Sequence, residues 1–192
     1  CGLAINSMRL PEHTFWIILL QTLLLVSCSR PDPPTINLYR AIHAGDLDQI
    51  KRHLYHGTDV NQPDREGQMP LHVAAERGRL VITRQLVDHG AQLDARNSRG
   101  HTALELAVLA GKTRVARLLL ERGAAMDTQA LLIETIRVNT NFRDVFDFLV
   151  KQGADVNAPE SSGETPLIVA VREGHRLLVK RLINEGADVN LP

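Results

Sequence analysis

The chain has 192 residues, and its 22 basic and 22 acidic side chains give a formal net charge of zero. This balance indicates no basic face of the kind that binds nucleic acid, and aromatic residues, at 4% of the chain, are too few for a base-stacking surface. The two cysteines, Cys1 and Cys28, exclude a disulfide or a cysteine-based zinc site in the part of the chain beyond residue 28.

An apolar run, FWIILLQTLLLV, occupies residues 15–26 and is interrupted only by Gln21. A helix that crosses a bilayer needs about 20 apolar residues, whereas the apolar region of a signal peptide has about 7–15. The run therefore indicates a signal peptide, which we assign to residues 1–27. Residues 1–7 precede Met8, and we interpret them as an upstream extension or a start-site artefact.

The end of this run, Leu25-Val26-Ser27-Cys28, resembles the lipobox of bacterial lipoproteins. In that family the signal is cut before the cysteine, which then carries the lipid. The resemblance therefore implies that Cys28 is lipidated, for example with palmitate. Ser29 would by the same resemblance direct sorting to the outer membrane of a Gram-negative cell. The alternative is a free thiol at the end of an uncleaved anchor.

Three prolines, Pro31, Pro33 and Pro34, follow within residues 28–35. Proline favours the extended polyproline II conformation, which rises about 3.1 Å per residue. We therefore expect residues 28–35 to be a lipidated, stiff spacer of ~20 Å between the membrane and a folded domain over residues 36–192.

From residue 36 onward the chain repeats itself. A glycine that closes an apolar run recurs at intervals of 33, 33, 30 and 33 residues, and a related polar tail follows each one. These glycines are Gly57, Gly90, Gly123, Gly153 and Gly186. A fixed period of this length is typical of stacked repeat proteins.

The best-formed copy spans Gly67–Gly100 and opens with Met69–Ala74, MPLHVA. Variants of this opening are Thr102–Ala107, TALELA, and Thr165–Ala170, TPLIVA. The pattern resembles the T-P-L-H-x-A motif of ankyrin repeats. The resemblance implies an all-α solenoid of about five stacked helix-turn-helix units with short β-hairpin or turn fingers. We place the repeats at residues 36–66, 67–99, 100–129, 130–162 and 163–192.

The apolar spacing within each copy predicts two helices. In copy two, Leu71, Ala74 and Ala75 share one face of the first helix, and Gly78 ends it because glycine enters the left-handed cap easily. The second helix carries an apolar stripe in copies two to four. The stripe comprises Ile82, Leu86 and Val87, then Val115, Leu119 and Leu120, then Val145, Phe146, Leu149 and Val150. No single unit can bury these faces alone, so the units must stack.

Two copies depart from this layout near the middle and the start of the repeats. Copy one has Gln49 and His53 where copy two has Ile82 and Leu86, which predicts the polar outer face of an N-terminal capping repeat. Between copies three and four several hairpin residues are absent, which accounts for the 30-residue interval. We therefore predict two helices there without a projecting finger.

The last copy has no polar cap repeat after it. We expect Leu178, Leu182 and Ile183 to face outward at this free end, with Arg181 serving partly as a cap. Either this end stacks on a partner or on a second copy of the chain, or it is a frayed final repeat.

We find no sequence motif for catalysis, nucleotide binding or metal binding. His53 and His56 are three residues apart, but no third ligand lies near them. His72 is expected to bond to the neighbouring turn, and Asp64, Glu66 and Glu160 are expected to face water. We predict no enzyme activity, no cofactor and no metal, with a small enzyme or metal-binding protein on a repeat scaffold as the rival reading.

The resemblance implies that partners bind the finger tips and the exposed side of the first helices. At the tips the predicted binding residues are Arg65, Glu66 and Gln68, then Ser98, Arg99 and His101, then Ser161, Ser162 and Glu164. On the first helices they are Glu76, Arg77, Leu109, Arg172 and Glu173, with His43 at the matching position of copy one. Leu109 is the one apolar member and therefore the expected anchor.

Together these patterns predict a non-catalytic protein-interaction module tethered to the bacterial envelope, on the periplasmic face of the outer membrane. We expect a protein partner, membrane contact through the lipid, no nucleic acid and a monomeric chain, with end-to-end contact through the last repeat as a variant. The alternative is a cytosolic or secreted, host-directed ankyrin protein whose N-terminal anchor is not cleaved.

Overall fold

The computed structural model describes residues 30–138, 142–160 and 162–191. The chain divides into two units, Cys1–Pro33 and Pro34–Pro192, and the helices described here belong to the second. The signal peptide, Cys28 and Ser161 lie outside the described residues, so the predictions made for them stay predictions. Among the described helices, none combines the length and apolar character that crossing a membrane would require.

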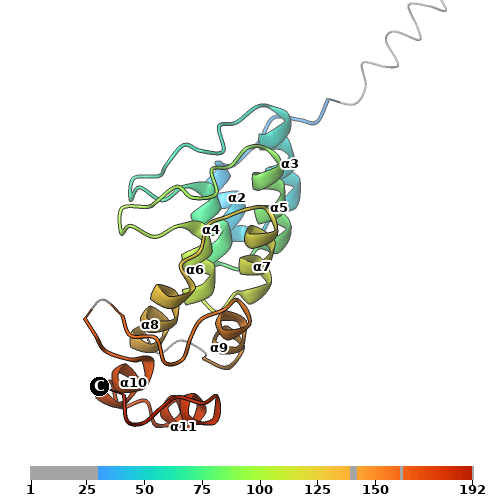
Figure 1. Cartoon of the computed structure of the whole chain (residues 1–192). Helices are drawn as coiled ribbons and strands as arrows, with labels where there is room; N and C mark the ends of the chain where they lie inside the picture. The colour runs from blue at the N-terminus through green and yellow to red at the C-terminus, as the bar shows by residue number, and fades with distance from the viewer. Residues whose placement is uncertain (1–29, 139–141, 161, 192) are drawn as a thin grey trace, which may run out of the picture. The chain divides into compact units, whose positions relative to one another are not determined.

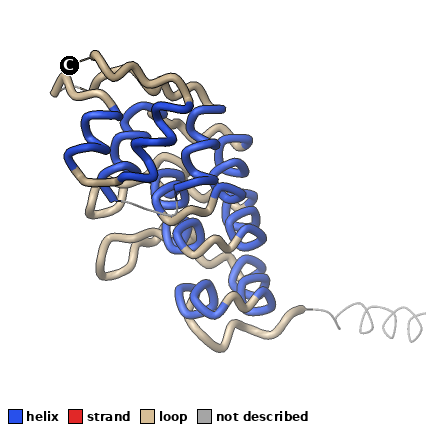
Figure 2. Tube along the Cα trace, turned by 90° about the horizontal axis from the view of Figure 1, so that it is seen from below, coloured by secondary structure: helices blue, strands red, loops and turns tan. Residues whose placement is uncertain are grey.

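Within its described residues the chain forms ten helices, arranged as five successive pairs, and no strand. The pairs are α2 (Leu38–Ala44) with α3 (Leu47–Tyr55), α4 (Pro70–Glu76) with α5 (Leu80–Asp88), α6 (Ala103–Leu109) with α7 (Thr113–Glu121), α8 (Thr128–Val138) with α9 (Phe142–Lys151), and α10 (Pro166–Arg172) with α11 (Arg176–Asn184). Figure 1, and Figure 2 from a perpendicular direction, show the pairs following one another within this unit. The all-α repeat solenoid predicted from the sequence is confirmed.

The core runs between the helix layers. The first helices of the pairs pack in the order α2, α4, α6, α8 and α10, and α5, α7 and α9 pack side by side behind them. The predicted stripe is buried at Ile82, Leu86, Val115, Leu119, Val145, Phe146 and Leu149, and Val87, Leu120 and Val150 pack against it partly buried. Each internal pair therefore buries apolar side chains that it could not bury alone.

Local signals start and stop these helices where the sequence places them. Thr102 and Thr165 cap α6 and α10, and each side-chain oxygen accepts the backbone N–H three residues on. Proline occupies the first position of α4 and α10, where its missing N–H breaks no helical bond. Gly78 follows α4 with a φ of 69°, a left-handed conformation that favours glycine.

The predicted polar outer face of copy one is wrong at His53. Its side chain is buried, with Nε2 2.7 Å from the carbonyl oxygen of Ile36 and Nδ1 3.0 Å from the hydroxyl of Thr58. Gln49, partly buried, accepts the backbone N–H of Thr35 at 2.9 Å. These polar side chains bind the chain segment before α2, so the stack is closed by hydrogen bonds to its own backbone.

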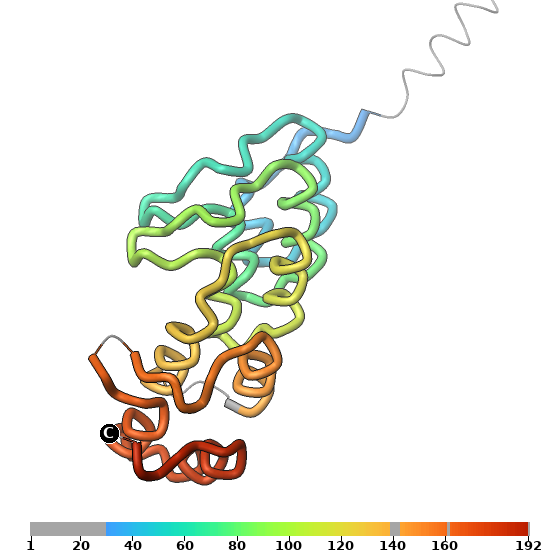
Figure 3. The backbone as a smooth tube through the Cα atoms, in the orientation of Figure 1, coloured from blue at the N-terminus to red at the C-terminus, as the bar shows by residue number. Residues whose placement is uncertain are grey.

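The predicted absence of a finger between copies three and four is confirmed. Helix α7 ends at Glu121 and α8 begins at Thr128, and the connection runs directly between them in Figure 3. By contrast, the loops before α4 and α6 project beyond the helices.

The prediction for the last copy is wrong for two of its three apolar residues. Leu178 and Leu182 are buried inside the α10–α11 pair, whereas Ile183 is exposed as expected. Arg181 does not cap the end: its guanidinium lies 5.2 Å from the ring centre of Phe146 on α9 and forms an ion pair with Asp147. Besides Ile183, the large apolar side chains exposed in the last copy are Val171, Leu177, Val189 and Leu191.

Candidate interaction surface

Three fingers share one backbone design. In each, a backbone N–H donates to the carbonyl oxygen four residues later, at 2.9 Å from Asp64, 2.9 Å from Asn97 and 3.0 Å from Glu160. A glycine three residues after each of these positions adopts a positive φ, for example 83° at Gly100, which lets the tip turn back. The fingers are therefore tight turns and not the β-hairpins that the sequence allowed.

An acceptor side chain fixes each of the first two turns. The Asp64 carboxylate accepts the N–H groups of residues 66 and 68, both at 2.9 Å, and the Asn97 carbonyl accepts those of residues 99 and 101, both at 3.0 Å. The Glu160 carboxylate instead accepts the Ser162 hydroxyl at 2.7 Å and forms an ion pair with Arg137 at 2.5 Å. The expectation that Asp64 and Glu160 simply face water is therefore wrong.

These turns leave the charged tips of the first two fingers in solvent. Arg65, Glu66 and Arg99 are exposed, and within the described residues the side chains of Arg65 and Arg99 make no hydrogen bond or ion pair. Ser98, also exposed, donates its hydroxyl to the carbonyl oxygen of Glu66 at 2.6 Å and joins the two fingers. Arg65 and Arg99 are thus available to a partner, whereas Ser98 connects the two fingers.

The base of the first finger is anchored to α2. The Tyr39 hydroxyl lies 2.7 Å from the carbonyl oxygens of both Gln62 and Gln68 and donates to this pair of acceptors. Burial, and secondly the nearby negative charge of Asp64, raises the pKa of Tyr39 far above its usual value. Gln68 is itself half-buried, so this predicted binding residue holds the finger more than it presents a contact.

The third finger carries an ion-pair cluster. Arg172 at the end of α10 bonds both carboxylate oxygens of Glu164 and lies 3.4 Å from the carboxylate of Glu173. Its hydrogen bond to Glu164 raises the pKa of the Arg172 guanidinium. The structure therefore joins three predicted residues into one charged group, beside the exposed Ser162.

The remaining predicted residues lie at the ends of the first helices. Arg77 and His43 are exposed, whereas Glu76 and Leu109 are half-buried. Leu109 therefore presents only part of its side chain to solvent. His101, at the base of the second finger, pairs with Glu134 of α8 at 3.1 Å.

The sequence analysis did not identify the surface of α8 as part of this region. Without a finger before it, α8 is flanked by two grooves of about 560 and about 710 Å³, and Asp127 lines both of them. Glu134 and Arg137 line the larger groove. The 30-residue interval was the signal for this opening, since the missing finger would have covered it.

Within the described residues no three His, Cys, Asp or Glu side chains are grouped as a metal site would require. His72 is buried and bonds through Nε2 to the carbonyl oxygen of Ala95 at 2.9 Å, in the stretch leading to the next finger. The predicted bond from His72 to the neighbouring turn is therefore confirmed.

Paired helices, projecting turns and an extended face with free charged tips define a repeat solenoid of the class that binds partners over its surface. The chain belongs to the ankyrin-repeat family: the model of that family, described as ankyrin repeats in three copies, matches residues 38–130 and 131–192.

Known proteins from distant organisms share these repeats. The ankyrin repeat protein L38 of Acanthamoeba polyphaga mimivirus is 40% identical over 53 residues, 28% of this chain and 27% of that protein. The ankyrin repeat and KH domain-containing protein 1 of Homo sapiens is 49% identical over 49 residues, 26% of this chain and 2% of that protein. The potassium channel SKOR of Arabidopsis thaliana is 49% identical over 156 residues, 80% of this chain and 19% of the channel. The chain thus spans less than a third of each relative.

Proposed function

We propose that this chain is a non-catalytic binding protein that holds a protein partner against its finger tips and the adjoining first-helix face. The observation that carries the proposal is that Arg65 and Arg99 are exposed and unpaired within the described residues. Both are held at the tips of rigid turns, are exposed and have no side-chain partner among the described residues. Arginine side chains presented in this way suit bidentate contacts with a partner's carboxylates or carbonyl groups.

The open surface of α8 extends the proposed contact area. The grooves on either side of α8 lie on the first-helix side of the stack, and Val138 beside the larger one is 56% exposed. A partner that contacts both the tips and this surface would meet charged residues at its rim and an apolar side chain within it, as protein interfaces generally do.

Site-directed photocrosslinking tests the binding face. A photoreactive residue replaces Arg99 in one variant and Lys51, exposed on α3, in the control. We expect a discrete adduct from position 99 and none from position 51. An adduct from position 51 alone would place the partner on the second-helix side and contradict the proposal.

A double variant then tests whether the same face supplies affinity. Arg99→Ala with Leu109→Ala should lower capture of the crosslinked partner at least tenfold. The matched control is Arg84→Ala with Val81→Ala, which removes one arginine and one aliphatic side chain from α5, where both are exposed. Thermal unfolding of both double variants checks that Leu109→Ala has not unfolded its repeat. Equal capture of the partner by the two folded double variants would contradict the proposed binding face.

We further propose that the module is tethered to the bacterial envelope through a lipid on Cys28, with the spacer of residues 28–35 between them. The lipobox pattern Leu25-Val26-Ser27-Cys28 supports this tether. Cells fed labelled palmitate should label the wild-type chain and not Cys28→Ser. Equal labelling of the wild-type chain and Cys28→Ser would contradict the lipoprotein proposal and favour an uncleaved anchor. Fractionation of the labelled cells tests the periplasmic face of the outer membrane as the location.

A further inference from the structure

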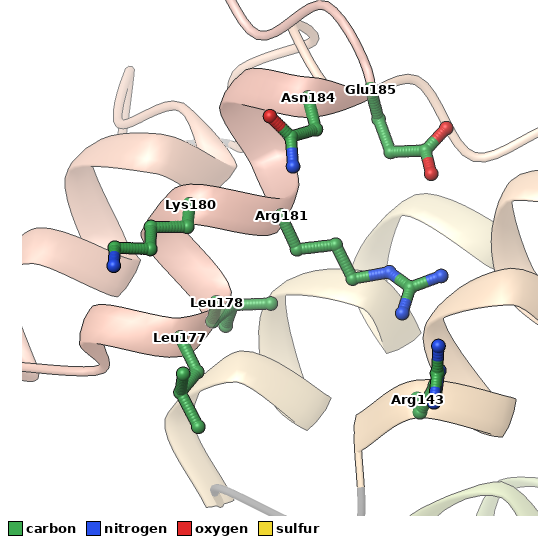
Figure 4. A pocket seen from close by; sticks show the side chains of 7 residues that line it. All are labelled: Arg143, Leu177, Leu178, Lys180, Arg181, Asn184 and Glu185. Carbon is green, nitrogen blue, oxygen red and sulfur yellow. The ribbon is translucent and has the colours of Figure 1, made fainter.

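A groove of about 680 Å³ opens between α9 and α11, the second helices of the last two pairs. Figure 4 shows its side chains: Arg143 rises from α9, and Leu177, Leu178 and Arg181 come from α11. The groove belongs to the second-helix layer and includes none of the finger residues considered above.

Arg181 is held in place on one wall. Its guanidinium forms an ion pair with Asp147 and lies 5.2 Å from the ring centre of Phe146. In the repeat register it stands where copies three and four have the buried Leu118 and Phe148. Asp147 uses only part of the five-donor guanidinium, and Nε is buried without a hydrogen-bond partner among the described residues. The guanidinium is therefore fixed in position, and its terminal N–H groups are more than Asp147 takes up.

Arg143 supplies a second guanidinium on the opposite wall. It is exposed, and it makes no hydrogen bond or ion pair with any described residue. In Figure 4 its head faces that of Arg181, whereas Lys180 points away from the space between the helices. The lining holds three cations and a single carboxylate, Glu185. Asp147, paired with Arg181, already offsets one of these positive charges, and an anion between the two guanidinium groups would offset their remaining repulsion.

An apolar surface adjoins this arginine pair. Leu177 is 85% exposed, the highest value among the large apolar side chains of the described residues, and Leu178 closes the groove beneath it. An exposed leucine beside paired arginines resembles a small interface, with an apolar contact next to charged hydrogen-bond donors.

We propose that this groove binds a peptide segment of a second protein, one that is acidic and rich in leucine. One carboxylate of the segment is held between Arg143 and Arg181, and a neighbouring aliphatic or aromatic side chain packs on Leu177. Charge complementarity selects the carboxylate, since arginine binds it through two parallel hydrogen bonds. The site lies outside the fingers, so it gives the protein a second binding surface beyond the proposed one.

Fluorescence polarisation with the full chain tests this site. The probe is a labelled ten-residue peptide in which glutamate and leucine alternate. The comparison peptides carry lysine in place of glutamate, or serine in place of leucine. We expect the wild-type chain to bind the glutamate–leucine probe saturably and neither comparison peptide. The affinity for the probe should be at least tenfold lower in Arg143→Glu and in Leu177→Asp. It should also fall as the salt concentration rises.

Matched controls occupy the same helix position elsewhere. Arg114, like Arg143, is the second residue of its helix and is exposed, and Val81 stands in α5 as Leu177 does in α11. Arg114→Glu and Val81→Asp should leave the affinity within twofold. Circular dichroism of all four variants checks that each is folded.

Several outcomes overturn the proposal. One is the absence of saturable binding, and another is equal affinity of wild type and Arg143→Glu. Competition by inorganic phosphate as strong as by unlabelled probe would reduce the groove to a simple anion site. Sedimentation that shows an Arg143-dependent dimer, or Arg143-dependent binding to phosphatidylglycerol vesicles without probe binding, would assign the groove to a second copy or to a membrane. The finger proposal is unaffected by each of these results.

Discussion

The buried imidazole of His72 joins the start of α4 to the stretch that leads to the second finger. His72 accepts the backbone N–H of Met69 through Nδ1 at 3.0 Å, so the proton of the neutral ring is on Nε2, which donates to Ala95. Protonation of Nδ1 would remove the acceptor at the start of α4. Burial disfavours the charged ring and lowers the pKa of His72 below its ordinary value.

The lowered pKa makes stability depend on pH. With the folded pKa below the unfolded value of about 6.5, the contribution of His72 is complete above pH ~6.5 and decreases as the pH falls toward the folded value, by at most about 1.4 kcal/mol per pH unit. Urea unfolding at pH 7.5 and pH 5.0 measures this decrease. It should be smaller in His72→Gln than in wild type, and unchanged in His43→Gln, whose side chain is exposed. Equal decreases in wild type and His72→Gln would contradict this assignment.

Asn97 stabilises the second finger by its acceptor oxygen alone. Its amide nitrogen is buried without a hydrogen-bond partner, and Asp64 performs the same role in the first finger. We expect Asn97→Ala to lower the unfolding free energy by about 1–2 kcal/mol. Asn97→Asp should stay within about 0.5 kcal/mol of wild type, because a carboxylate keeps both accepted bonds. Chemical denaturation measures both, and a larger loss for Asp than for Ala would refute the acceptor role.

Sequence reasoning predicted the bond of His72 but missed the finger acceptors, for a physical reason. His72 fills the histidine position of the T-P-L-H-x-A motif that this copy resembles, so its role follows from the resemblance. Asp64, Asn97 and Glu160 differ in type and share only a side-chain oxygen at one register position. Only the folded turn shows that this oxygen accepts backbone N–H groups at Asp64 and Asn97, and a hydroxyl and a guanidinium at Glu160. The exposure of Arg65 and Arg99 follows from the same turn geometry.

At the scale of one helix, α4 is less well capped than its equivalents. Thr102 and Thr165 place a hydroxyl oxygen at the starts of α6 and α10, whereas the cap of α4 is Met69, whose thioether is a weak acceptor. Met69→Thr should raise the unfolding free energy by about 0.5–1 kcal/mol, and Thr102→Ala should lower it by about 1 kcal/mol. Thermal or urea unfolding measures both changes. No gain from Met69→Thr would mean that the hydrogen bond from Met69 to His72 already satisfies this helix start.

The error in the prediction for the last copy also has a cause at the scale of one helix. The register correctly aligned Leu178 and Leu182 with Val115 and Leu119, but these positions pack inside each pair and stay buried in the last copy. The position that changes is Val171, which aligns with Val108. Val108 is fully buried by the neighbouring pair, whereas Val171 is 60% exposed. Periodicity identifies apolar positions, and only the stack shows which of them need a neighbour.

At the scale of the folded unit, zero net charge conceals a local separation of charge. The groove between α9 and α11 carries three cations and one carboxylate, whereas Asp127, Glu134 and Glu160 outnumber Arg137 in the groove beside α8. Composition alone therefore says little about which partners each surface accepts. The groove beside α8 should favour a cationic segment and the groove between α9 and α11 an acidic one. The variants at Arg99 and at Arg143 lie on different surfaces, so they test the finger and groove proposals separately.

The stability of the unit should also vary along the stack, because each pair is stabilised mainly by its neighbours. The α10–α11 pair packs on α8, and its other face leaves Val171 and Ile183 exposed, so it lacks the second interface that α6–α7 has. We expect amide hydrogens of α10 and α11 to exchange at least tenfold faster than those of α6, equivalent to an opening free energy lower by about 1.4 kcal/mol. Hydrogen exchange with mass spectrometry measures this in the free protein. Addition of the glutamate–leucine probe should slow exchange in α11 but not in Arg143→Glu, because binding stabilises only the state with a formed groove. Uniform protection from α4 to α11 would show that the unit opens as a whole and that the last pair needs no further neighbour.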